Sequence, residues 1–341
     1  MTVSMPDQAA IDAAARALEA GRLVAFPTET VYGLGADAQN PAAIAAIYAA
    51  KGRPSNHPVI VHLAPGADIG RWATAIPEEA HRLIAAFWPG PLTLILKRAP
   101  GVPAAVAGGQ DSIGLRCPSH PVAQALLLAF RGGQGGIAAP SANRFGHVSP
   151  TTAAHVLDEF GGGPASPLAA VLDGGASQVG IESTIVDLSR MDSSGPALLR
   201  PGQISAEQIA QVIGTRPGAG GTDAPRVSGA LASHYAPRTP VVLLDREALE
   251  GALSRLAAAG RRAALIVTDA ALAAGQSHVA LPPQPDGYAQ GLYAALRQMD
   301  AVGADVIIVE RPPRDAAWMG INDRLRRAAH GSEQALERLL G

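Results

Sequence analysis

The sequence predicts an α/β fold in two parts, and three features of the chain point to it. Short apolar runs that suit buried strands alternate with segments whose apolar residues recur at helical spacing. Polar motifs follow several predicted strands, as expected when a sheet presents a ligand cleft at its strand ends. Residues 216–240 are rich in Gly, Pro, Ala, Ser and Thr and interrupt the pattern before it restarts. We therefore predict domains at 1–215 and 241–341, joined by a linker.

The first part opens with an amphipathic helix over residues 7–20 and a strand at 23–25. A second helix, 41–50, has Asn40 as its N-cap and Pro41 at its first position. The elements that follow are strand 59–63, helix 78–87, strands 92–97 and 113–116, helix 122–130, and strands 137–139, 170–172, 184–188 and 197–199. This order predicts a mixed α/β domain on a twisted sheet, with a ligand cleft.

After residue 240 the chain alternates between strands and helices again. The predicted elements are strand 241–244, helix 246–259, strand 263–267, helix 288–302, strand 306–309 and helix 322–340. This alternation predicts a small Rossmann-like domain with a parallel sheet. No glycine-rich phosphate fingerprint opens any of its helices, so we assign it no chemistry of its own.

Composition narrows the class of protein. The chain has 341 residues, of which 48% are hydrophobic and 16% charged, which suits a globular protein with a sizeable core. A net charge of −2 argues against a broad surface for nucleic acid. The single cysteine, Cys117, excludes an internal disulfide and a multi-cysteine zinc site, and it suits a buried filler in a reducing cytoplasm. We expect neither export nor membrane insertion.

Polar motifs recur along the first domain. Residues 26–37, Phe-Pro-Thr-Glu-Thr-Val-Tyr-Gly-Leu-Gly-Ala-Asp, read as a turn whose glycines and hydroxyls suit a polar ligand. Five further motifs follow: Lys51-Gly52-Arg53-Pro54, Pro89-Gly90-Pro91-Leu92-Thr93, Pro140-Ser141-Ala142-Asn143, Glu182-Ser183-Thr184-Ile185-Val186-Asp187, and Leu199-Arg200-Pro201-Gly202.

The cations and hydroxyls of these motifs suit a polyphosphate. The chain contains no phosphate loop, zinc helix, nucleophile elbow or complete dinucleotide fingerprint. A nucleotide would therefore be held by other groups. Lys51 and Arg53 could each bind a different phosphate group, or they could lie at a solvated helix end. Ser141 and Asn143 could bind phosphate or ribose, or could cap a turn.

The sequence alone does not decide the roles of three further sets of side chains. Arg116 closes an apolar strand and needs a partner, which is either a substrate carboxylate or an internal one. His62 fits a core histidine or a ligand group. Glu29, Glu182 and Asp187 are candidates for metal contact, but their spacing defines no site.

Taken together, the six motifs resemble the YrdC-like family, the threonylcarbamoyl-AMP synthases, over roughly the first two thirds of the chain. Ser233-His234-Tyr235-Ala236-Pro237 resembles the linker signature of the family's long form. The resemblance implies a YrdC-like catalytic domain that joins L-threonine, bicarbonate and ATP into threonylcarbamoyl-AMP and pyrophosphate. Mg²⁺ would accompany the ATP. The product would pass to a tRNA threonylcarbamoyl transferase, with tRNA binding here at most weakly.

The resemblance also assigns residues to each substrate. It places L-threonine at Thr30, His62, Arg116, Ala139 and Ser183. It places ATP at Lys51, Arg53, His57, Ser141, Asn143, Ser149, Arg200 and Tyr235. Lys51 and Arg53 would be the catalytic pair, and Tyr235 would close over the nucleotide as part of a lid that the second domain positions.

Other functions compete with this interpretation. An RNA-binding module could use the basic cleft of Lys51, Arg53, Arg116, Arg144 and Arg200, although aromatic residues are only 4% of the chain. A carbamoyl transferase of hydrogenase maturation would need cysteine-rich zinc modules, which one cysteine cannot supply. A scaffold that kept the fold without the activity would not need the polar motifs.

Overall fold

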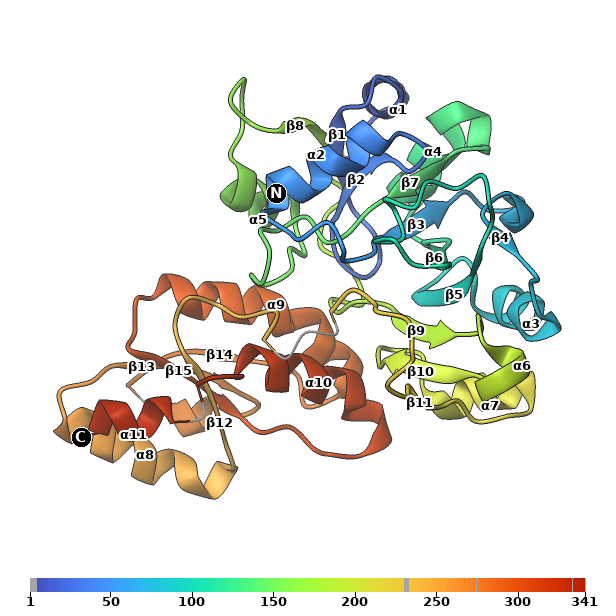
Figure 1. The fold of residues 1–341 in the computed structure, drawn as a ribbon. Helices are drawn as coiled ribbons and strands as arrows, with labels where there is room; N and C mark the ends of the chain where they lie inside the picture. Colours follow the sequence, from blue (N-terminus) through green and yellow to red (C-terminus); the bar gives the residue numbers. More distant parts are fainter. Residues whose placement is uncertain (1–4, 230–232, 274, 333, 341) are drawn as a thin grey trace. The chain divides into compact units, whose positions relative to one another are not determined.

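The computed structural model describes residues 5–229, 233–273, 275–332 and 334–340 (Figure 1). It divides into two compact units, Met1–Phe145 with Pro150–Ala230, and Gly146–Ser149 with Leu231–Gly341. The first part of the predicted linker therefore packs with the first unit. A short segment from within the predicted first domain packs with the second.

A mixed sheet forms the centre of the first unit. Its strands are β1 Leu23–Phe26, β2 Gly33–Asp37, β3 Ile60–Leu63, β4 Ala73–Thr74, β5 Leu92–Arg98, β6 Ser112–Arg116, β7 Gly136–Ala138, β8 Leu168–Val171, β9 Thr184–Asp187, β10 Ala197–Arg200 and β11 Gly218–Ala219. They lie in the order β11-β10-β9-β5-β6-β3-β7-β2-β1-β8, with β4 beside β5. Parallel pairs such as β3 and β6 stand next to antiparallel pairs such as β5 and β6, so the predicted mixed sheet is confirmed.

The helices of the first unit are α1 Gln8–Glu19, α2 Pro41–Lys51, α3 Glu78–Phe87, α4 Pro121–Ala129, α5 Ala153–Phe160, α6 Met191–Ser194 and α7 Ala206–Ile213. Most of them begin at a side chain that caps them, whereas α3 and α6 have no side-chain cap. Asn40 caps α2 as predicted, accepting bonds from the backbone of Ala42 and Ala43. Helices α5 and α7 were not predicted from the sequence, although Ser205 and Gln208 form a capping box at the start of α7.

Residues 33–37 form strand β2, so the prediction that they belong to a turn is wrong. Gly35 pairs with Val24 of β1, and β7 lies on the other side of β2. A Cβ on Gly35 would lie 2.9 Å from a ring carbon of Phe26 and 3.0 Å from both the side chain of Ile137 and the carbonyl oxygen of Val24. Glycine is required here because its neighbours close over the strand.

Side-chain alternation along the strands divides the first unit into two cores. In β1, Leu23 and Ala25 enter a core shared with α2, α3, α5 and α7, whereas Val24 and Phe26 enter a core shared with α1 and α4. Helices α1 and α4 cover only part of their face of the sheet. Farther along that face, Ile60, Ile95 and Ile185 pack with Val227 of the linker instead.

The second unit is a small parallel sheet with helices, as predicted. Strands β12 Val241–Leu244, β13 Ala263–Val267, β14 Ser277–Ala280 and β15 Val306–Glu310 lie in the order β12-β15-β13-β14, and all pairs are parallel. The helices are α8 Arg246–Ala258, α9 Pro285–Ala301, α10 Met319–Ala328 and α11 Ala335–Leu340. The prediction of one helix over 322–340 is wrong, because α10 ends before Gly331, whose φ is +81°. In the described part of the chain, no helix is long and apolar enough to cross a membrane.

Candidate functional site

The candidate site lies on the sheet face that α1 and α4 leave open. Val61, Leu94 and Leu115 of β3, β5 and β6 point into the core on the opposite face. Because side chains alternate along a strand, those of His62, Thr93, Ile95 and Arg116 point to the open face. His62 and Arg116 pair in register on adjacent parallel strands, so two residues predicted to bind L-threonine lie side by side.

Arg116 has an internal carboxylate partner, which is one of the two partners that the sequence left open. Its Nη2 lies 2.8 Å from Oε1 of Glu29, and the two side chains are only 5% and 4% exposed. Its Nε donates a hydrogen bond to the carbonyl oxygen of Gly90 at 3.3 Å. Glu29 comes from the turn between β1 and β2, so the first motif supplies the counter-ion for a cation on β6.

Glu29, Glu182 and Asp187 do not converge. Among the described residues, no group of three or more His, Cys, Asp or Glu side chains could hold a metal ion. Asp187 instead accepts bonds from the backbone and hydroxyl of Ser189 and pairs with Arg190. These three carboxylates therefore have separate surroundings.

His62 is a neutral imidazole inside the site. Burial, followed by the positive charge of Arg116, lowers the pKa of His62 to about 3. Its ring packs edge-on against Phe26, with ring centroids 6.0 Å apart. A neutral ring can donate or accept a hydrogen bond without adding charge beside Arg116.

Thr30 belongs to a network of hydroxyl groups in the same turn. The hydroxyl of Thr28 donates to the carbonyl oxygen of Val31 at 2.6 Å. Because that bond uses its one hydrogen, the 2.9 Å contact between the two threonine hydroxyls is a bond donated by Thr30. The oxygen of Thr30 keeps its acceptor capacity, and both side chains are buried.

Ser183 joins the residues predicted for L-threonine to those predicted for ATP. Its hydroxyl lies 2.8 Å from the hydroxyl of Thr93. The guanidinium of Arg200 donates to the hydroxyl and to the carbonyl oxygen of Ser183 at 3.1 and 3.0 Å. Ala139 adjoins this face, where its backbone N–H donates to Ile60 at 2.9 Å.

Lys51 holds the Pro140–Asn143 turn. Its ammonium donates to the carbonyl oxygens of Ser141, at 2.6 Å, and of Asn143. Burial, together with the neighbouring charge of Arg53, lowers the pKa of Lys51 well below its ordinary value. The structure thus brings Lys51, Ser141 and Asn143 together at the end of α2, and the solvated helix end considered from the sequence is not what forms.

Arg53 and His57 flank the loop that follows α2. Arg53 donates through Nη2 to the carbonyl oxygen of Pro58 at 2.8 Å and to the hydroxyl of Ser228 at 2.9 Å. The ring of His57 packs edge-on against Phe145, with centroids 5.6 Å apart. Burial and then the charge of Arg53 lower the pKa of His57.

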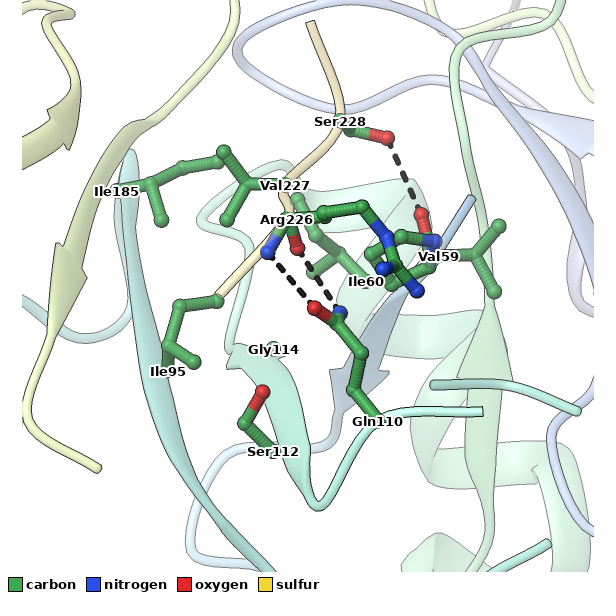
Figure 2. Close-up of a pocket in the computed structure, with 11 residues that line it drawn as sticks. Val59, Ile60, Ile95, Gln110, Ser112, Gly114, Ile185, Arg226, Val227 and Ser228 are labelled. Atoms are coloured by element: carbon green, nitrogen blue, oxygen red, sulfur yellow. Dashed lines mark hydrogen bonds between the residues drawn. The ribbon is translucent and has the colours of Figure 1, made fainter. Parts of the chain in front are cut away.

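A segment of the linker, residues 226–228, lies across this face. Figure 2 shows the paired hydrogen bonds in which Gln110 accepts from the backbone N–H of Arg226 at 2.7 Å and donates to its carbonyl oxygen at 3.1 Å. The carbonyl oxygen of Ser228 accepts a bond from Arg200 at 2.9 Å. Val227 is 8% exposed. Gln110 and residues 226–228 line a pocket together with apolar side chains of β3, β5 and β9.

Two family models match this chain. One, described as telomere recombination and covering Sua5, YciO and YrdC proteins, matches residues 16–202. The other, described as the C-terminal domain of threonylcarbamoyl-AMP synthase, matches residues 204–330. The chain belongs to the threonylcarbamoyl-AMP synthase family.

Relatives and solved structures agree with this assignment over nearly the whole chain. The threonylcarbamoyl-AMP synthase of Pyrococcus abyssi is 38% identical over 328 residues, which covers 93% of each chain. That of Bacillus subtilis is 39% identical over 329 residues, covering 93% of this chain and 92% of the relative. The solved structure of P. abyssi Sua5 complexed with L-threonine matches with a TM-score of 0.88 at 36% identity, covering 96% of each chain.

Tyr235, predicted to close over ATP in this synthase, lies within the second unit. It is 1% exposed, and its ring centroid is 5.6 Å from that of Tyr293. The guanidinium carbon of Arg324 lies 5.5 Å from the same ring. Tyr235 has a φ of +61°, which is uncommon for a residue with a side chain, so the surrounding contacts hold it in place.

Ser149 also groups with the second unit, although the sequence places it among first-domain motifs. The segment Gly146–Ser149 is tied there because Gly146 accepts a backbone bond from Ala236 at 3.0 Å. Ser149 itself is fully buried. The residues predicted for L-threonine thus all lie in the first unit, whereas those predicted for ATP are divided between the two units.

The structure removes the surface on which the RNA-binding alternative depends. Lys51, Arg53, Arg116 and Arg200 are 3%, 8%, 4% and 3% exposed and bond within the protein, whereas Arg144 is exposed. Buried cations cannot form a patch that follows a nucleic-acid backbone. Cys117 is buried as predicted, and burial raises the pKa of its thiol to about 11, which disfavours the thiolate of a nucleophile.

Several residues of the candidate site were not predicted from the sequence. Thr28 and Thr93 stand inside quoted motifs, so their hydroxyls could have been added to the candidate set. Gln110 and Ser228 lie in stretches without a recognisable pattern, and only the folded chain brings them to the site.

Proposed function

We propose that this synthase joins L-threonine, bicarbonate and ATP into threonylcarbamoyl-AMP and pyrophosphate. The observation that carries the proposal is the direct contact between Ser183, from the residues assigned to L-threonine, and Arg200, from those assigned to ATP. Two substrates bound at these groups would have their reacting ends in one water-poor cleft.

The chemistry needs positioning and charge neutralisation more than covalent catalysis. The threonine amine adds to bicarbonate with loss of water and gives a carbamate. A carbamate oxygen then attacks the α-phosphorus of ATP, and the bond to pyrophosphate breaks. Arg53 and Arg200 would stabilise the phosphate oxygens, while Lys51 would hold the turn that carries Ser141 and Asn143.

Mg²⁺ would enter as part of the ATP substrate, held by phosphate oxygens rather than by a protein cage. We expect the product to be consumed by a tRNA threonylcarbamoyl transferase, because a carbamoyl phosphate anhydride hydrolyses readily in water. We place this reaction in the cytoplasm. Direct binding of tRNA is not needed, since the cations of the site are buried.

The linker segment 226–228 would act as a lid over the phosphate site. Ser228 offers its hydroxyl oxygen to Arg53 and its carbonyl oxygen to Arg200, as a phosphate would offer its oxygens. Val227 anchors the segment on Ile95 and Ile185. ATP would therefore displace Ser228 from both arginines, and the lid would close again on the product.

Pyrophosphate release by the purified protein tests the proposed function. Release from ATP should require L-threonine and bicarbonate together and should fall about 100-fold or more in Arg53→Ala and Lys51→Ala, since each loses a positioned cation. Exposed Arg82→Ala and Lys97→Ala are matched controls and should keep the wild-type rate.

Pyrophosphate release at the same rate with and without L-threonine would contradict the proposed function. If ATP is untouched while structured RNA binds with a steep dependence on salt, the RNA-binding alternative would replace it.

A further inference from the structure

Helices α9 and α10 of the second unit each bond to a short segment that carries a residue predicted for ATP. Arg297 of α9 donates a hydrogen bond to the carbonyl oxygen of Val148, next to Ser149. The carbonyl oxygen of Arg327, in the last turn of α10, accepts a bond from the backbone N–H of His234 in the linker at 3.4 Å. The second unit, to which the sequence assigns no chemistry, is therefore bonded to both segments.

Arg324 is a fully buried cation in α10, where a guanidinium without partners would be costly. Its Nη1 lies 3.2 Å from Oδ2 of Asp323. The same carboxylate pairs with Arg326 at 2.7 Å and with Arg327 at 3.0 Å. One carboxylate is thus shared among three guanidinium groups. The face of an aromatic ring is a further favourable neighbour for a buried cation.

Tyr235 of the linker supplies such a face. The guanidinium carbon of Arg324 lies 5.5 Å from the centre of its ring, and Tyr235 is 1% exposed. The rings of His234 and Tyr293 pack against the same ring, with centroids 4.2 and 5.6 Å away. The φ of Tyr235 is +61°, a costly conformation for a residue with a side chain, and it persists only where surrounding contacts fix it.

We propose that Arg324 is a positioning residue that holds Tyr235 in place and thereby fixes the path of the linker at the nucleotide site. This inference rests on the proposed function, which brings ATP to Tyr235. A linker that is already held loses less conformational freedom when ATP binds, and this favours affinity. The second unit would then contribute to the reaction by positioning the linker, without a reacting group of its own.

The competing explanation is that Arg324 only stabilises α10 as the partner of Asp323. In that case its loss would lower the stability of the second unit without affecting ATP more than L-threonine. The residues predicted for L-threonine all lie in the first unit, so the two substrates can be compared in one protein.

Steady-state pyrophosphate release by the full chain separates these explanations. Arg324→Met keeps a long side chain but removes the charge, and it should raise the KM for ATP about tenfold, the worth of a desolvated cation–π contact. The KM for L-threonine should stay within about twofold of wild type. Arg326→Met is the matched control, because Arg326 pairs with the same carboxylate but its side chain is 73% exposed, and it should keep both KM values.

A double-mutant cycle with Tyr235→Leu tests whether Arg324 acts through Tyr235. Because Tyr235→Leu removes the aromatic face, adding Arg324→Met to it should raise the KM for ATP less than about twofold further. If Arg324→Met does not fold, Arg324→Lys replaces it in the cycle, since lysine keeps a cation without the planar guanidinium, and its effect should also depend on Tyr235.

Three results would overturn the inference. An unchanged KM for ATP in Arg324→Met, or an equal rise in KM for both substrates, would reduce Arg324 to a structural partner of Asp323. Additive effects in either cycle would show that Arg324 does not act through Tyr235. These outcomes leave the proposed function intact, whereas wild-type protein that releases no pyrophosphate would remove that function together with the inference.

Discussion

At the scale of single residues, the site is formed by polar groups withdrawn from water. Lys51, Arg116 and Arg200 are almost fully buried, and each bonds to carbonyl, hydroxyl or carboxylate oxygens of the protein. Such burial costs stability unless the groups are paired, but it makes each charge act strongly on a bound substrate. His62 is the residue whose burial can be followed most directly, because it titrates near neutral pH when unfolded.

We expect His62 to make stability depend on pH. Its folded pKa, about 3, lies below the unfolded value, so the unfolded chain takes up the proton first as the pH falls. The stability linked to this group is complete above about pH 6.5 and is lost progressively toward pH 3; between pH 7.5 and 5.5 it amounts to about 1.4 kcal/mol. Denaturant unfolding of His62→Gln should lack this loss.

Exposed His81→Gln is the matched control for that measurement and should follow the wild-type curve. Equal pH dependence in wild type and His62→Gln would show that the imidazole of His62 does not carry the effect. His57 and His120 also have lowered pKa values, but they are present in every variant compared.

At the scale of elements, alternation along the strands decides which side chains form the site. One set of alternate residues on β3, β5 and β6 enters a core, and the other set points to the opposite face, where Ile60 and Ile95 pack with Val227 of the linker. This segment has no regular secondary structure, so its position depends on Val227 and on the bonds between Gln110 and Arg226.

Weakening the linker anchor should therefore ease the entry of ATP. Val227→Ala removes two buried carbon atoms, worth about 1.5 kcal/mol, and the KM for ATP should fall by up to about tenfold if the segment competes with phosphate. Steady-state kinetics with saturating L-threonine measures this change. Val302→Ala, at a half-exposed position in the second unit, should leave the KM unchanged, and a raised KM in Val227→Ala would show that the segment helps to bind ATP.

At the scale of the whole molecule, the two units have separate hydrophobic cores but share the predicted ATP residues. Thr30, His62, Arg116, Ala139 and Ser183 all belong to the first unit, whereas Ser149 and Tyr235 belong to the second. A substrate that contacts both units would couple their motions, and one that contacts a single unit would not.

Hydrogen exchange measured by unit tests this division. L-Threonine should slow exchange in the first unit alone, around β3 and β6. A non-hydrolysable ATP analogue should also slow exchange in the second unit, at α9 beside Tyr235, because ligand binding raises the free energy of local opening. Unchanged exchange in α9 with the analogue would remove Ser149 and Tyr235 from the nucleotide site.

Much of the architecture follows from local features of the chain. Helices with clear caps, such as α2, and apolar strands, such as β13, appear close to their predicted bounds, because capping and burial are local properties of the chain. The parallel order of the second sheet followed from alternating elements. The position of Arg116 at the end of an apolar strand singled it out, since a buried cation is costly without a partner, and the family resemblance added Ser183.

Which of these groups meet depends instead on how the strands and the linker pack together. In a short stretch of sequence, glycine favours the prediction of a turn. In the folded chain, packing against Phe26 and Ile137 makes Gly35 part of a central strand. The pairing of Glu29 with Arg116, and the reach of Ser228 to Arg53 and Arg200, join residues far apart along the chain. Such contacts depend on sheet order and on the path of the linker, and no local pattern encodes either.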